Sequence, residues 1–234
     1  MDKSVFVEQA AQEAAEAEIV PGDGRADALL REARARIYHW PADFRGFECK
    51  IAYLDGVDSF EGTLSTGGSR RIELDLPGLA DSRWLRFQIE ELLAHREAPE
   101  VNKMASKTGC SWGDWDENYG RRIDFLGDKM SSFYRIKDRK LTQIGRRYKG
   151  RNFIINIDAH HSYDDKFVAN FYTAYYWSNE DEKLVQVETY LDEYQKVGEV
   201  HLPARRLVTE AVDGKLRSRC VSFSEPALLK EKSA

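Results

Sequence analysis

The stretch that decides the fold is KFVANFYTAYYW, at residues 166–177. It is rich in aromatic residues and contains neither Gly nor Pro, which is typical of a β-strand. Because successive side chains of a strand point to opposite faces, we expect one face to carry four of these aromatic residues: Phe167, Phe171, Tyr175 and Trp177. That face is expected to form a core or, if the sheet is curved and incompletely filled, to line an apolar cavity with ligand-binding side chains.

Similar stretches lie on both sides of this one, from Lys107 to Glu225, and are separated by Gly, Asp, Asn and Pro. Such an order predicts an antiparallel meander. Several stretches exceed the usual strand length, which favours a curved, half-barrel-like sheet. The expected strands are Ile123–Leu126, Ser132–Lys137, Lys140–Tyr148, Asn152–Ala159, Lys166–Trp177, Lys183–Tyr194, His201–Val212 and Lys215–Phe223.

Helices are expected before this meander. Residues Ala26, Leu29, Leu30, Ala33 and Ile37 recur at helical spacing, and a second apolar stripe follows a cap at Asp81 or Ser82. Between them, alternation from Phe47 to Tyr53 and the Asp55-Gly56 pair predict a hairpin. We therefore expect the α+β class: a curved, mostly antiparallel sheet with two packing helices. Residues 1–22 are expected to form an additional N-terminal helix, and residues 23–234 one α+β domain.

Composition excludes several classes of protein. The 35 Lys and Arg residues against 40 Asp and Glu give a net charge of -5, so a nucleic-acid partner is not expected. Charges interrupt every hydrophobic stretch, so we do not expect an integral membrane protein. The alanine-rich start shows no secretory signal, and Cys49, Cys110 and Cys220 form no CxxC pair, which together predict a cytoplasmic protein with reduced thiols.

Three stretches resemble a family of proteins. They are Tyr38-His39-Trp40 with Phe44-Arg45-Gly46-Phe47, then Gln88–Arg96, and then Gly127–Arg135. Together they resemble an uncharacterised bacterial family, prominent in photosynthetic bacteria, that is known only as a domain of unknown function. The resemblance covers about Leu29 to Phe223 and implies no activity.

A fainter architectural similarity is to periplasmic lipoprotein carriers. In those proteins a curved antiparallel sheet wraps an apolar cavity that helices close. This similarity implies the same kind of sheet here, whereas the absence of a visible export signal departs from those carriers.

Residues that could carry chemistry are few. Asp158, His160 and His161, with Asp164 and Asp165, are the densest set of metal-type ligands, but alternation separates the two His residues, so we predict no metal site. Cys110 lies in a stretch expected to be a loop, without an identifiable base. No phosphate-binding loop is found, so no cofactor is expected.

A basic segment and three aromatic residues add two further candidates. Arg146, Arg147, Lys149 and Arg151 could hold a phosphate or carboxylate group, or form a solvated sheet face. Trp112, Trp115 and Tyr119 could form an exposed rim or lid, or anchor a long loop.

Three functions remain open from the sequence. The first is non-enzymatic binding or carriage of a small hydrophobic or lipid-like ligand by the aromatic strand. The second is a protein-interaction module with an exposed aromatic or basic patch. The third is an enzyme whose site gathers His95, His160 and His201; no catalytic residue is assigned.

Overall fold

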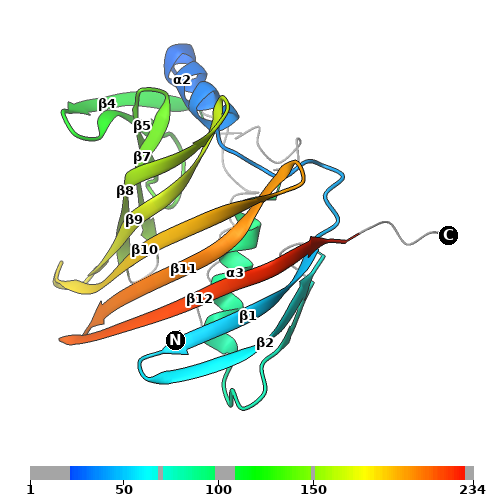
Figure 1. The fold of residues 1–234 in the computed structure, drawn as a ribbon. Helices are drawn as coiled ribbons and strands as arrows, with labels where there is room; N and C mark the ends of the chain where they lie inside the picture. The colour runs from blue at the N-terminus through cyan, green and yellow to red at the C-terminus, as the bar shows by residue number, and fades with distance from the viewer. Residues whose placement is uncertain (1–21, 68–70, 98–108, 149–150, 230–234) are drawn as a thin grey trace. The chain divides into compact units, whose positions relative to one another are not determined.

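The chain folds as an antiparallel sheet with two helices in the described residues (Figure 1). A computed structural model describes residues 22–67, 71–97, 109–148 and 151–229, with the backbone alone at 148 and 151. The elements are α2 (Gly24–Ala35), β1 (Phe47–Asp55), β2 (Asp58–Thr66), β3 (Ile72–Asp75), α3 (Arg83–Ala94), β4 (Cys110–Asp116), β5 (Gly120–Phe125), β6 (Phe133–Lys137), β7 (Lys140–Tyr148), β8 (Arg151–Tyr163), β9 (Lys166–Ser178), β10 (Leu184–Val197), β11 (Val200–Val212) and β12 (Lys215–Leu228).

The hydrogen-bonded strand order is β3-β2-β1-β12-β11-β10-β9-β8-β7-β6-β5-β4. From β4 to β12 each strand neighbours the next in the chain, so the predicted α+β class and antiparallel meander are confirmed. The predicted N-terminal helix falls almost entirely outside the described residues. Neither described helix has the length and apolarity needed to cross a membrane.

The chain divides into two compact units. The first contains the described parts of Met1–Tyr38, Glu100–Thr189 and Glu210–Lys215. The second contains those of His39–Pro99, Tyr190–Thr209 and Leu216–Ala234. Both units contain register shifts between strands, and such β-bulges bend a sheet, which accounts for the predicted curvature.

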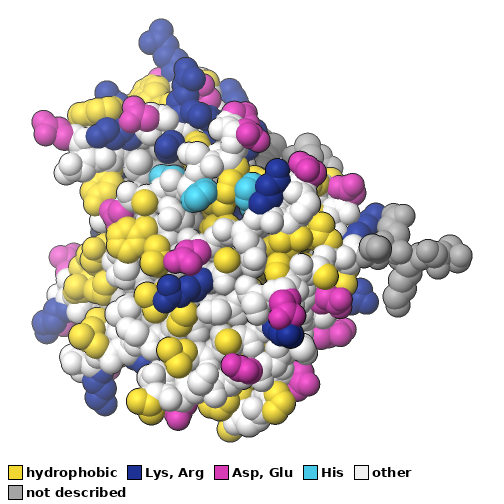
Figure 2. Space-filling model, viewed as in Figure 1, with side chains coloured by type: hydrophobic (Ala, Val, Ile, Leu, Met, Phe, Trp, Pro, Cys, Tyr) yellow, Lys and Arg dark blue, Asp and Glu magenta, His cyan; other side chains and the backbone are white. Residues whose placement is uncertain are grey.

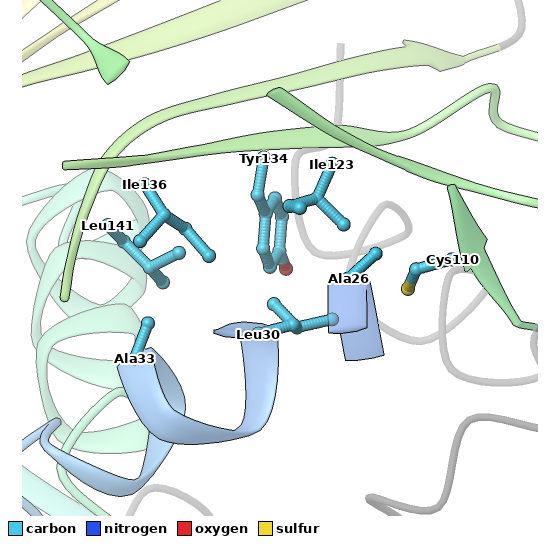
Figure 3. Close-up of a cluster of buried hydrophobic side chains, with 8 residues drawn as sticks. All are labelled: Ala26, Leu30, Ala33, Cys110, Ile123, Tyr134, Ile136 and Leu141. Atoms are coloured by element: carbon cyan, nitrogen blue, oxygen red, sulfur yellow. The ribbon is translucent and has the colours of Figure 1, made fainter. Parts of the chain in front are cut away.

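In the first unit, α2 packs on one face of the sheet. The helix begins after Asp23, whose carboxylate accepts hydrogen bonds from the backbone N–H groups of Arg25 and Ala26 at 2.7 and 3.4 Å. Figure 3 shows its apolar stripe against the strands. The cluster consists of Ala26, Leu30, Ala33, Cys110, Ile123, Tyr134, Ile136 and Leu141, with Ile37, Ile144 and Ile157 packed around it. The predicted apolar stripe of this helix is confirmed.

In the second unit, α3 buries its apolar side. Leu85, Ile89, Leu92 and Leu93 are buried, as their spacing predicts. Of the two expected caps, Asp81 accepts a hydrogen bond from the backbone N–H of Arg83 at 3.0 Å, whereas the Ser82 side chain makes none. The β1–β2 hairpin has the predicted turn after Asp55.

One prediction of local structure is wrong. The stretch around Cys110, expected to be a loop, is strand β4, which pairs with β5 and ends the strand order. The pairing contains a register shift between Trp112 and Trp115, and Gly113 lies inside it. Glycine and aspartate are rare in strands, so the composition of this bulged strand resembles a loop.

Candidate functional site

The aromatic strand β9 does not keep one alternation along its length. Its partner β8 has an extra residue, Asp158, between Ile157 and Ala159, and β9 has an extra residue, Asn170, between Ala169 and Phe171. Residues that face each other in an antiparallel pair point to the same side of the sheet. Beyond each extra residue, the side chains of that strand therefore point to the opposite faces from those that simple alternation predicts.

This reversal separates Phe167 from the other three predicted ligand-binding residues. Ile157 packs with the α2 cluster and pairs with Tyr172, so Phe171 points away from α2. After the bulge, Phe167 points toward α2 instead. The prediction of one face shared by Phe167, Phe171, Tyr175 and Trp177 is therefore wrong for Phe167.

Phe167 has a packing role in the first unit. It is 3% exposed, and its ring contacts the His160 ring at a centroid distance of 5.2 Å. Its backbone N–H donates to the carbonyl of Arg36, and its carbonyl accepts from the N–H of Tyr38, each at 2.8 Å. Phe167 thus holds the chain that leaves α2 against the sheet.

Phe171, Tyr175 and Trp177 remain together on the face away from α2, and we call them the aromatic row. Phe171 is 38% exposed, and Tyr175 and Trp177 are half-buried. The rings of Tyr175 and Trp177 lie 6.0 Å apart. Figure 2 shows hydrophobic side chains at the surface over the region of β8 and β9. The aromatic row is therefore open to solvent in part, unlike the α2 cluster.

A polar group lies beside the aromatic row. On the same face, Gln143 pairs with Asn156, and Asn156 pairs with Thr173. The Asn156 amide nitrogen donates to the Tyr119 hydroxyl at 2.9 Å, and its oxygen accepts from the Gln143 amide at 2.9 Å. These bonds fix the Tyr119 hydroxyl, which sequence reasoning placed only on a rim or loop.

The Tyr119 hydroxyl also lies near a negative charge, the carboxylate of Asp158. Burial, followed by the negative charge of Asp158 and the nearby Tyr175, raises the pKa of the Tyr119 phenol. Asp158, the extra residue of β8, is exposed. The face therefore combines an apolar row with a carboxylate and a neutral hydroxyl, an arrangement that suits a ligand with an apolar body and a polar end.

The two histidines of β8 pack in different surroundings. Burial lowers the pKa of His160, which favours the uncharged ring, and its Nε2 donates to the Leu141 carbonyl at 2.9 Å. His161 packs on Tyr163 instead. Within the described ranges, no three His, Cys, Asp or Glu residues are grouped to hold a metal ion. His160 belongs to the first unit and the other two candidate histidines, His95 and His201, to the second.

Cys110 is a packing residue rather than an exposed nucleophile. It is 0% exposed in the α2 cluster, and burial, with a contribution from Asp27, raises the pKa of its thiol to about 12. A thiol of this kind stays protonated at neutral pH and is a poor nucleophile.

Two tryptophans of β4 are exposed, as the rim interpretation predicts. Trp112 is 38% and Trp115 56% exposed. Between them lies Arg121, whose guanidinium carbon is 5.8 Å from the Trp112 ring and 5.6 Å from the Trp115 ring. These cation–π contacts involve side chains of β4, the last strand in the described strand order.

The second unit contains a groove of about 710 Å³ on β1, β2, β3 and β12. Six of its lining side chains are charged: Glu48, Lys50, Glu73, Asp75, Arg86 and Glu225. Arg86 donates to the Ile72 carbonyl, and Lys50 pairs with Glu225. The groove does not offer the apolar surface that a hydrophobic ligand needs.

Comparison with known proteins gives a family without an activity. A family described as "Protein of unknown function (DUF3386)" matches residues 23–229. No curated protein matches the chain. The resemblance to an uncharacterised family is confirmed.

Proposed function

We propose that this chain, which belongs to the DUF3386 family of proteins of unknown function, is a non-enzymatic binder of a small hydrophobic or lipid-like molecule. The observation that carries the proposal is the aromatic row, which lies partly exposed on the sheet face away from α2. Isolated exposed apolar residues are ordinary, but three aromatic side chains on one face of one strand form a surface that a ligand can cover.

The polar group beside the row gives the ligand an orientation. The apolar body of the molecule lies on Phe171, Tyr175 and Trp177. Its polar end, a hydroxyl or amino group, donates to the exposed carboxylate of Asp158 or to the Tyr119 hydroxyl. The ligand thus rests on an open face and not in a closed cavity, and Phe167 supports the strand from the other side.

The proposal places this binder in the cytoplasm of a bacterial cell. Its three cysteines are free, with Cys49 and Cys110 buried and Cys220 half-buried. Such a set of reduced thiols suits a reducing compartment.

The test is a fluorescence titration with N-phenyl-1-naphthylamine, a neutral apolar probe. Wild-type protein is expected to bind it saturably, and Trp177→Ala and Tyr175→Ala are expected to weaken binding about tenfold or more, because aromatic anchors dominate such surfaces. The matched control is Trp115→Ala, which removes a more exposed tryptophan from another strand of the same unit. Equal affinity in Trp177→Ala and Trp115→Ala would sink the proposal.

A protein-interaction module is the second candidate, and one observation favours it. Strand β4 ends the described strand order and carries two exposed tryptophans. An edge strand offers its free backbone groups to an extended segment of a partner, and aromatic side chains supply anchors. In a pull-down, a partner held by wild type and by Trp177→Ala, but lost from Trp112→Ala/Trp115→Ala, would identify this function.

A further inference from the structure

Two arginines converge on one buried tyrosine on the α2 side of the first unit. Tyr134, 9% exposed, reaches from β6 toward α2 (Figure 3). The Arg146 Nη2 group of β7 donates to its hydroxyl at 3.2 Å. The guanidinium carbon of Arg34 on α2 lies 5.4 Å from the Tyr134 ring centre and 5.6 Å from that of Phe125.

Neither arginine has an acidic partner in the described part of the chain. Two other arginines of this unit do: Arg139 pairs with Glu32 at 3.0 Å, and Arg122 with Asp124 at 2.7 Å. The Nε of Arg146 is buried and meets no hydrogen-bond acceptor among the described residues. A buried donor without an acceptor costs free energy unless something outside the protein satisfies it.

The pKa of Tyr134 also reflects the two nearby positive charges. Burial by itself would raise the pKa of the phenol, yet the positive charges and hydrogen bonds of Arg146 and Arg34 lower it below its usual value. The protein thus holds two positive charges beside one tyrosine side chain, although like charges repel. Two guanidiniums that face a common point are the side chains best suited to an oxyanion.

We propose that Arg34 and Arg146, both beside the Tyr134 side chain, bind an oxyanion, either a carboxylate or a phosphate group. Arg34 and Arg146 are each half-buried as whole residues, so the anion reaches them from solvent while the Tyr134 side chain stays covered. Arg147, the next residue of the strand, points to the other face and is exposed, so it does not share this site with Arg146. The site lies on the face opposite the aromatic row and does not depend on the proposed function.

The experiment is isothermal titration calorimetry of the full chain in a chloride buffer free of oxyanions. The probes are inorganic phosphate and acetate, in separate titrations. Saturable binding of at least one probe is expected, and Arg34→Gln and Arg146→Gln should each weaken it by about tenfold to a hundredfold, the range for one lost charge-assisted hydrogen bond.

The matched control is Arg31→Gln, which removes an exposed arginine one turn earlier on α2. It should leave the affinity almost unchanged. Circular dichroism checks the fold of each variant, and Arg34→Gln alone carries the test if Arg146→Gln does not fold. Binding of phosphate without acetate, or the reverse, tells which oxyanion the site takes. Wild type without saturable binding of either probe, or equal weakening by Arg31→Gln, overturns the proposal.

Discussion

A buried ion pair in the second unit gives the sharpest prediction about stability. Arg206 and Asp192 have side chains that are 3% and 1% exposed. Two charge-assisted hydrogen bonds join them, Nε to Oδ1 and Nη2 to Oδ2, each 2.7 Å long. The remaining Nη1 donates to the backbone and side-chain oxygens of Gln88 at 3.1 and 3.2 Å. The carboxylate of Asp192 therefore neutralises the positive charge of the Arg206 guanidinium at hydrogen-bonding distance.

Asp192→Asn removes that charge and leaves Arg206 buried. Breaking one side of a buried pair costs about 3–5 kcal/mol, because an uncompensated charge stays in the interior. The assay is urea denaturation, which should show this loss in the free energy of unfolding. The control, Glu225→Gln, breaks an exposed pair with Lys50 in the same unit and should change stability little.

A double variant separates charge from packing. Asp192→Leu/Arg206→Met removes both charges and should recover much of the lost stability, since hydrophobic replacement of a buried pair is often neutral or better. The reasoning is refuted if Asp192→Asn costs no more than Glu225→Gln, or if the double variant is less stable than Asp192→Asn.

Three further predictions concern other buried positions. Burial lowers the pKa of His160 below 6.5 in the folded protein. As pH falls, this histidine therefore takes up a proton in the unfolded chain at a higher pH than in the folded protein, which favours unfolding. Stability should therefore decline below about pH 6.5, and His160→Gln should lessen this decline in denaturation curves; an unchanged decline contradicts the assignment. Cys49 and Cys110 have pKa values raised to about 12 by burial, so a thiol reagent should modify only Cys220 in native protein, and all three after unfolding. Gly46→Ala should destabilise by about 1 kcal/mol or more, because φ is 112° there, and thermal melting that matches wild type would argue against this backbone.

Regular strands and helices were predictable because their packing follows local periodicity. In β1, Phe47, Cys49, Ile51 and Tyr53 are all buried, as alternation predicts. The ladder from β1 to β2 has no register shift, so the period of two continues along the whole strand. The apolar stripe of α2 was predictable for the same reason, because its buried residues recur at the helical period without interruption.

The faces of β9 were not predictable, because bulges leave no clear pattern in hydrophobicity. Asp158 and Asn170 are the extra residues, and both types are uncommon in strands. That is the one feature of the sequence that could have suggested a break. Without pairing information, alternation across Asn170 assigns Phe167 to the wrong face.

Strand β10 shows a second limit. Its buried face carries Gln186, Glu188, Tyr190 and Asp192, while the hydrophobic residues between them are less buried. Tyr176 and Gln186 donate hydrogen bonds to the carboxylate of Glu188, so its burial is compensated by partners from other positions. Hydrophobic periodicity predicts that the opposite face of this strand is buried. Only the hydrogen-bond partners explain why the polar face is buried instead.

The central claim is that the aromatic row binds a small apolar molecule, and native mass spectrometry of gently purified protein tests it most directly. We predict a stoichiometric apolar adduct on the wild type that persists in Trp115→Ala, is lost from Trp177→Ala, and appears in an organic extract. A clean mass for the wild-type chain, or an adduct that survives Trp177→Ala, would contradict the account.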